Sequence, residues 1–323
     1  MHILLILIAI GIACALVLNA LYKRTNHFQS QFVDVRKFWK TSARQDNLQV
    51  VNLGSNHPKF GFDYSETGIR GENWAVGPQT FEYDFAILRQ NARYLPPGAT
   101  VVIPVCLLNF FLYRQKSRAI HAKYYSFLPK EDIVDYSWIE KLMVYDLPLL
   151  FHPKRVRFIF RDVKPDNLLE LSSNPMTTDE ELKNDGLRWI NCWNDEFDIK
   201  LPDPVLTNIN KQDISHNIRI LKQMLEYCKS NNYRPVIAIL PVTTYLSSLF
   251  TDEFIKTHIL KYIDEANVIN APAFNYLKDE RFTDSSLYIN TFFMNKKGRN
   301  LFTNVFVNEC LRDYENCSTQ SAI

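Results

Sequence analysis

The chain has 323 residues, of which 46% are hydrophobic and 22% are charged, and its formal net charge is +2. This balance is typical of a globular protein with one large domain or two small ones, and it gives no reason to expect a nucleic-acid partner. The six cysteines form no CxxC pair and no His-Cys ligand spacing, so we expect no metal site and no cofactor.

The first 22 residues predict a membrane anchor. Residues from Ile3 to Tyr22 carry no charge, and about 20 such residues cross a bilayer core. A cleaved signal peptide is the alternative, because Ala13-Cys14-Ala15 resembles a cleavage site, although no basic residue precedes the apolar run. We favour an uncleaved single-pass anchor at residues 1–22, followed by a stalk at residues 23–47.

Apolar strand-like runs alternate with helical patterns in the rest of the chain. Continuous apolar strands indicate a parallel sheet covered on both faces. We therefore predict a three-layer α/β/α domain over residues 48–323. The expected elements are strands at 49–53 and 73–77, a helix at 79–91, a strand at 100–105, a helix at 214–228, a strand at 235–240, a helix at 252–265, a short strand at 268–269 and a final helix at 296–314.

Residues 107–210 are too long for a plain crossover between two strands, so we interpret them as an insertion rich in aromatic residues. We expect it to lie over or beside the carboxyl edge of the sheet, where loops build ligand sites. Its basic run, Lys154-Arg155-Val156-Arg157 with Arg161, favours a solvated face. Contact with anionic lipid headgroups or a polyanionic glycan is the alternative.

Ser55 is the main candidate for a functional residue. It stands where the strand at 49–53 breaks into a small-residue turn, and the carboxyl ends of parallel strands are where open α/β sheets bind ligands. Gly54 lets a substrate approach the backbone closely. Taken alone, the turn favours an ordinary strand-to-loop junction with a polar cap, because Gly-Ser pairs are common in loops.

Three short blocks resemble those of the SGNH (GDSL-like) hydrolase superfamily. They are Asn52-Leu53-Gly54-Ser55-Asn56-His57, Asn73-Trp74-Ala75-Val76-Gly77-Pro78-Gln79-Thr80 and Met294-Asn295-Lys296-Lys297-Gly298. They are most similar to the membrane-anchored bacterial branch that includes D-alanyl transfer proteins and alginate acetylation proteins. The resemblance implies a flavodoxin-type parallel sheet and a domain outside the cytoplasm. Lys23 and Arg24, which follow the apolar run, favour a cytoplasmic domain instead.

The resemblance also implies roles for individual residues. Ser55 would be the acyl nucleophile, and the backbone N–H groups of Gly77 and Ser55 would stabilise the oxyanion. Asn109 is the nearest candidate for a third oxyanion donor, although the family's Gly-x-Asn is absent, and a structural or surface role is the alternative. The family's Asp-x-x-His block aligns here with Asn290 and Phe293.

This degenerate block leaves two functions open. Phenylalanine cannot accept a proton, and a serine without a general base is a weak nucleophile. We interpret His57 as a turn or rim residue, and His121 or His152 in the insertion as remote sources of a base. One function is a membrane-anchored esterase or acyltransferase acting on a cell-envelope glycan through Ser55. The other is a catalytically inactive binding or scaffold protein beside a membrane acyltransferase.

Overall fold

The computed structural model describes residues 2–40, 43–112, 121–161 and 176–320, with side chains as far as Cys310. The chain forms two compact units. The helical unit contains Met1–Arg44 and Lys116–Glu170, and the sheet unit contains Gln45–Gln115 and Leu171–Ile323. The expected insertion is therefore divided: residues 116–170 group with the N-terminal residues, whereas residues 107–115 and 171–210 group with the sheet.

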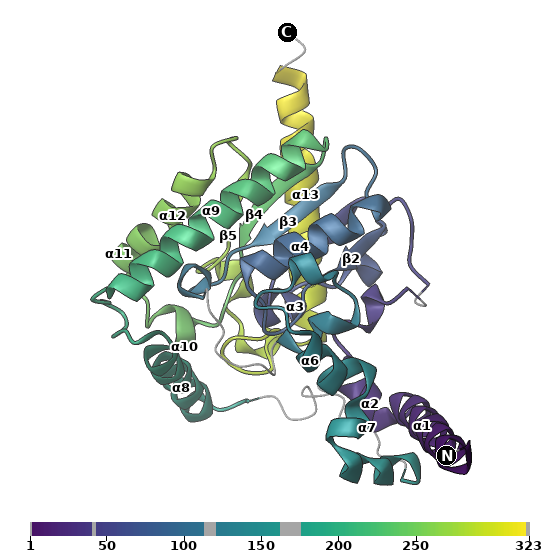
Figure 1. Cartoon of the computed structure of the whole chain (residues 1–323). Helices are drawn as coiled ribbons and strands as arrows, with labels where there is room; N and C mark the ends of the chain where they lie inside the picture. Colours follow the sequence, from purple (N-terminus) through teal and green to yellow (C-terminus); the bar gives the residue numbers. More distant parts are fainter. Residues whose placement is uncertain (1, 41–42, 113–120, 162–175, 321–323) are drawn as a thin grey trace. The chain divides into compact units, whose positions relative to one another are not determined.

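The sheet unit is built on five parallel strands in the order β2-β1-β3-β4-β5 (Figure 1). This 2-1-3-4-5 order is one of the two common doubly wound arrangements of α/β proteins. The α/β class with a parallel sheet is therefore confirmed. The strands are β1 (Val50–Asn52), β2 (Gly71–Asn73), β3 (Thr100–Pro104), β4 (Arg234–Ile239) and β5 (Ala273–Asn275).

Both faces of the central strands are buried. Val102 and Val236 are register partners on one face, where they join a core cluster with Phe302 and Phe306 of the last helix. Successive side chains of a strand point to opposite faces, so the neighbouring Ile237 faces the other side, where it is also fully buried. This burial explains the continuous apolar runs from which both strands were predicted.

Helices connect and cover the strands of the sheet unit. Both α8 and α9 begin with a capping box. In each, the hydroxyl of a threonine accepts from the backbone N–H three residues later, and the side chain of that later residue accepts from the backbone N–H of the threonine. The helices are α3 (Asn56–Lys59), α4 (Phe81–Asn91), α8 (Asp179–Phe197), α9 (Asn208–Ser230), α10 (Thr244–Ser247), α11 (Asp252–Ile255), α12 (Lys261–Ala266) and α13 (Lys296–Gln320), with a π-helical turn η10 (Lys256–Leu260) and short 3₁₀ turns that include η4 (Asn109–Phe111) and η12 (Ser285–Leu287).

Two predicted strands are misplaced. The second strand was expected at 73–77, but β2 ends at Asn73, and the apolar residues after it are buried loop residues. The last strand was expected at 268–269, whereas β5 begins at Ala273. Both β2 and β5 are edge strands that are not fully buried. The apolar residues from which the strands were predicted therefore lie in the chain next to each strand and not in it.

In the helical unit, α1 (His2–Lys23) is long and apolar enough to cross a membrane. Its last turns pack against a helical segment from the expected insertion. The buried side chain of Asn19 donates to the backbone oxygen of Asp146 at 2.8 Å and accepts from the N–H of Leu149 at 3.3 Å. The remaining elements are α2 (Asn26–Ser30), η1 (Arg36–Phe38), η5 (Tyr124–Ser126), η6 (Lys130–Asp132), α6 (Trp138–Lys141), η7 (Leu142–Asp146), α7 (Pro148–Phe151) and η8 (Pro153–Ile159).

Candidate functional site

Ser55 follows β1 and occupies the N-cap position of the short helix α3. The turn before it requires glycine, because Gly54 has φ +110° and a Cβ there would lie 2.3 Å from Cγ of Pro58. The Ser55 hydroxyl makes no capping hydrogen bond to α3. It accepts instead from the backbone N–H of Gln79, at 3.0 Å. The turn therefore holds the half-buried hydroxyl against the loop that follows β2.

A buried carboxyl supports this turn from behind. Asp84, on the first turn of α4, accepts hydrogen bonds through Oδ1 from the Gly54 N–H at 2.6 Å and from the side-chain amide of Gln79. The same Gln79 amide also donates to the carbonyl of Gly54, at 3.2 Å. Burial raises the pKa of Asp84 to about 7, although these two hydrogen bonds oppose the rise. We call Gly54, Ser55, Gln79 and Asp84 the Ser55 network.

The predicted oxyanion glycine lies next to this network. A Cβ at Gly77 would lie 1.5 Å from the side-chain oxygen of Asn56, so a larger residue there would require the Asn56 side chain to move. The backbone N–H of Ser55 donates to no group in the described part of the chain. That N–H is therefore available to a ligand, as an oxyanion donor must be.

Asn109 has a structural role. Its side-chain oxygen accepts from the backbone N–H of Cys106 at 2.8 Å, and the residue is buried at the start of η4. This contact closes the turn after β3. Of the two roles that the sequence allows for this asparagine, the contact therefore supports the structural one.

The loop before α13 carries the two residues of the degenerate block. The side-chain oxygen of Asn290 accepts from the backbone N–H groups of Phe292 and Phe293, at 2.9 and 2.8 Å, and so closes its own turn. The Phe293 ring packs against Phe60, the residue that ends α3, at 5.0 Å between centroids. The loop therefore lies against the helix that Ser55 begins, with Phe293 at its far end.

The histidines of the sheet unit have other partners than Ser55. His57 is buried, not a rim residue as we expected: its Nε2 lies 3.1 Å from the carbonyl oxygen of Pro241, and its ring lies 4.4 Å from that of Phe292. Burial lowers the pKa of His57 to about 4, so the imidazole is neutral. His216 contacts Glu82, and His258 contacts Tyr262. His121 and His152 belong to the helical unit.

Helix α8 provides further aromatic contacts to the same loop. Asp185 accepts from the hydroxyl and the backbone N–H of Thr291, at 2.5 and 3.1 Å. One turn later, the Trp189 ring lies 5.1 Å from that of Phe292 and 5.6 Å from that of Phe293. The second half of the expected insertion thus packs beside the loop that carries the degenerate block.

Sequence reasoning missed Gln79 and Asp84 as functional residues. The sequence places Gln79 in the second block without a role, and Asp84 within an ordinary helix. A signal was present, because an acidic residue sits among apolar neighbours in Phe81-Glu82-Tyr83-Asp84-Phe85-Ala86, where it falls on the buried side of α4. A buried carboxyl in such a position usually has a specific hydrogen-bond donor.

A separate cavity lies at the opposite end of the strand order. A space of about 680 Å³ opens at the carboxyl end of β5, and Asn275, Lys278 and Arg281 are among its lining residues. Its charged groups pair with one another, since Lys278 bonds Asp252 at 2.6 Å and Arg281 bonds Asp279 at 2.6 Å. We therefore assign it no ligand. Among the described residues, no group of three or more His, Cys, Asp or Glu side chains could hold a metal ion.

Comparison of the sequence with known proteins identifies no relative. No protein-family model matches the chain, and no curated protein matches it. The function must therefore be argued from the geometry of the Ser55 network.

Proposed function

We propose that this chain is a membrane-anchored, SGNH-like protein that binds an acylated cell-envelope glycan at the Ser55 network without hydrolysing it. In this role it would act as a binding or scaffold partner of an envelope acyltransferase. The proposal includes the three-layer α/β/α arrangement, which is supported by the 2-1-3-4-5 strand order and by the burial of both sheet faces. It also includes an extracytoplasmic position of the sheet unit, as the family resemblance implies.

One observation carries the proposal: the Ser55 hydroxyl accepts a hydrogen bond from the Gln79 N–H, and no described side chain accepts its proton. The residues of the sheet unit between 113 and 115 and between 171 and 175 include no His, Asp, Glu or Lys. Among the residues of the sheet unit whose side chains the structure describes, none is placed as a base for Ser55. Losing a positioned base typically lowers a hydrolytic rate by about 10²- to 10⁴-fold.

The binding role is supported by the groups that remain. The Ser55 N–H has no described partner, and the Asn56 side chain packs closely against Gly77. A turn that presents a backbone N–H such as that of Ser55 without a base can hold the carbonyl oxygen of an acyl group in place. The same groups would serve the second candidate, an active esterase or acyltransferase that uses Ser55 as its nucleophile.

A fluorophosphonate probe separates the two candidates, because it labels an activated serine without knowledge of the substrate. We expect the full-length protein and its Ser55→Ala variant to label equally weakly. Ser65→Ala is the matched control, since Ser65 is an exposed serine that hydrogen-bonds only near its own turn.

Strong labelling that Ser55→Ala abolishes and Ser65→Ala preserves would overturn the non-hydrolytic role. His121→Ala and His152→Ala would then show whether either histidine supplies the base. Binding is tested separately by isothermal titration with an acetylated and a deacetylated oligosaccharide of the same glycan. Preference for the acetylated form, lost on Gly77→Ala, is the expected result.

A further inference from the structure

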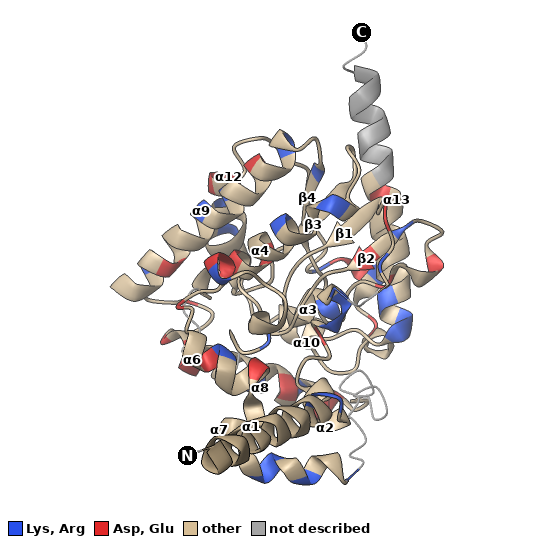
Figure 2. Cartoon of the chain, turned by 45° about the vertical axis from the view of Figure 1, so that its right-hand side comes forward, with Lys and Arg blue, Asp and Glu red and all other residues tan. Residues whose placement is uncertain are grey.

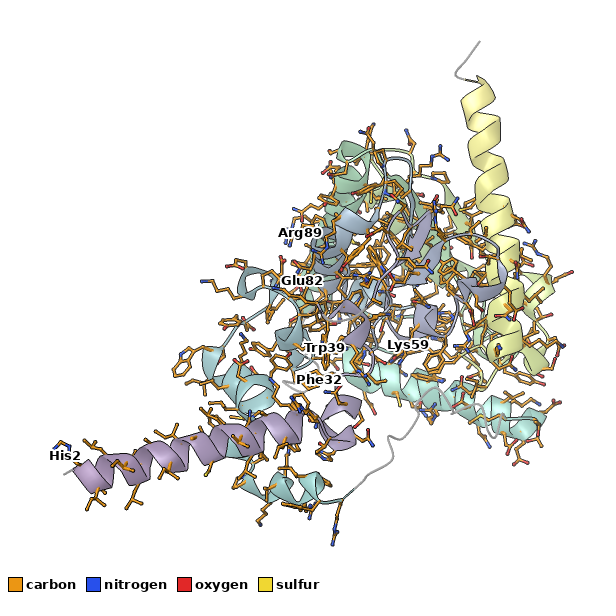
Figure 3. The ribbon with its side chains drawn as sticks, turned by 90° about the vertical axis from the view of Figure 1, so that its right-hand side faces the viewer. His2, Phe32, Trp39, Lys59, Glu82 and Arg89 are labelled. Atoms are coloured by element: carbon orange, nitrogen blue, oxygen red, sulfur yellow. The ribbon has the colours of Figure 1, made fainter. Side chains whose placement is uncertain are left out.

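The described end of the helical unit combines an apolar helix with a basic surface. Every residue of α1 from His2 to Leu18 is exposed, whereas Asn19 and Tyr22 are buried. At 1.5 Å per residue the exposed stretch is about 26 Å long, close to the thickness of a bilayer's hydrocarbon core of about 30 Å. Figure 3 shows His2 at the free end of this helix, whose apolar side chains stand clear of the rest of the unit. The contacts of Asn19 therefore mark the level at which α1 leaves the bilayer.

The segment held at this level has no acidic residue. It runs from Pro148 to Arg161, contains four basic residues, and packs along α1 through α7 and η8. Figure 2 shows the short basic helix beside α1, which itself carries almost no charge. The apolar side chains of this segment are exposed as well, with Leu150 at 69% and Phe160 at 80%. Exposed aromatic and aliphatic residues next to arginines are typical of elements that lie in the headgroup layer.

A cleft of about 400 Å³ opens between the end of α1 and the end of η8. Its lining residues include Leu21, Arg24, Phe160 and Arg161. Arg24 and Arg161 bring two guanidinium groups to it, and both residues are exposed. Guanidinium groups bind phosphate through paired hydrogen bonds, and Phe160 supplies an apolar edge for acyl chains.

We propose that this cleft and the segment from Pro148 to Arg161 form a binding site for the headgroups of anionic phospholipids. The Phe160 and Leu150 side chains enter the upper acyl region, and Arg24 and Arg161 contact the phosphate. The site is independent of the Ser55 network, because all of its residues belong to the helical unit. It orients that unit on the bilayer in addition to the anchoring by α1.

The first test is lipid binding by the full-length protein in a neutral detergent, followed by native mass spectrometry. Phosphatidylglycerol should bind, and phosphatidylcholine with the same chains should bind at least tenfold more weakly. Each basic residue near an anionic surface contributes about 1 kcal/mol, so Arg24→Gln with Arg161→Gln should weaken phosphatidylglycerol binding roughly 25-fold. The pair Arg24→Lys with Arg161→Lys should retain most of it. Lys183→Gln with Lys200→Gln, two exposed positions of the sheet unit, is the matched control.

Hydrogen exchange in nanodiscs then locates the lipid. Amides of the segment from Pro148 to Arg161 should exchange more slowly when phosphatidylglycerol replaces part of the phosphatidylcholine, and Arg24→Gln with Arg161→Gln should remove the difference. Equal binding of the two lipids, or exchange that is insensitive to lipid charge, would overturn the proposal. So would equal protection by inorganic phosphate alone, or protection by soluble polygalacturonate in place of lipid, since these identify a phosphate site or a glycan site.

Discussion

Asp84 lies in an environment that is unusual for a carboxyl. Its carboxyl is fully buried behind Gly54, where Oδ1 accepts two hydrogen bonds and Oδ2 has no described partner. Burial of a carboxyl favours its neutral, protonated form over the charged carboxylate. The protonation of Asp84 therefore bears on the turn that holds Ser55, although Asp84 does not touch the hydroxyl itself.

The pKa of Asp84 predicts a pH-dependent stability. The folded pKa is about 7, above the unfolded value of about 3.9, so between these values the folded state keeps a proton that the unfolded state has lost. The free energy of unfolding should therefore fall as the pH rises from about 4 to about 7, by as much as about 4 kcal/mol. In Asp84→Asn this decrease should be absent, because an amide does not titrate, and the amide oxygen can still accept both hydrogen bonds. Urea unfolding at several pH values measures it.

The exposed Asp264 provides the control for this experiment. Asp264→Asn removes the same charge without a buried site, so its stability should follow the wild-type pH profile. A profile for Asp84→Asn that also falls between pH 4 and 7 would contradict the assignment of this titration to Asp84.

At the scale of elements, the loop before α13 decides whether Ser55 can be activated. Asn290→Asp keeps both backbone hydrogen bonds of the turn, because a carboxylate oxygen can accept from the same N–H groups. Phe293→His places an imidazole among the rings of Phe60, Trp189 and Phe292. If this loop faces Ser55 as the family alignment implies, the double variant should gain aryl-acetate hydrolysis of about 10²-fold over the wild type. The gain should disappear on Ser55→Ala.

Phe292→His, combined with Asn290→Asp, is the matched control for the double variant. Phe292 is the adjacent ring and packs against His57 and Trp193. It should give no gain if Phe293 is the residue at the histidine position of the block. A gain from Phe292→His that exceeds that from Phe293→His would mean that the alignment is shifted by one residue.

The elements that the sequence predicts well are those whose burial is uniform. β3 and β4 are covered on both faces, so their apolar runs coincide with the strands. β2 and β5 are partly exposed edge strands, and their neighbours carry the apolar signal instead. Of the candidate site, Ser55 and Gly77 could be named from their blocks, whereas the link from Gly54 to Asp84 spans 30 residues and has no local pattern.

Across the whole molecule, charge is divided between the two units. The helical unit has 16 Lys and Arg against 9 Asp and Glu, and the sheet unit has 21 against 26. The near-neutral total thus conceals a basic unit that carries the apolar helix and an acidic unit that carries Ser55. An anionic membrane attracts the first unit, whereas a polyanionic glycan gains no long-range attraction from the second.

The apolar helix predicts that the full chain is an integral membrane protein. Full-length protein should stay in the membrane pellet after a carbonate wash, because α1 buries an uncharged stretch in the bilayer. Ile8→Lys with Ile12→Lys should release much of it, since each charge at the centre of a spanning helix costs about 2.5–3.5 kcal/mol. The exposed pair Lys183→Gln with Lys200→Gln should leave it in the pellet. Release of the wild-type chain would exclude an anchor, and a mass lacking the first residues would indicate a cleaved signal peptide.

Reporter fusions at the C-terminus then test on which side of the membrane the body lies. Lys23 and Arg24 favour the cytoplasm, whereas the resemblance to membrane-anchored envelope proteins favours the outside. We expect a fusion to alkaline phosphatase to be active and a fusion to green fluorescent protein to be non-fluorescent. Alkaline phosphatase matures only outside the cytoplasm, and green fluorescent protein only within it. The opposite pair of results would place Ser55 away from any envelope glycan. The glycan proposal would then fail, whereas the lipid site beside Arg24 would stand, since it needs only an anionic leaflet at the end of α1.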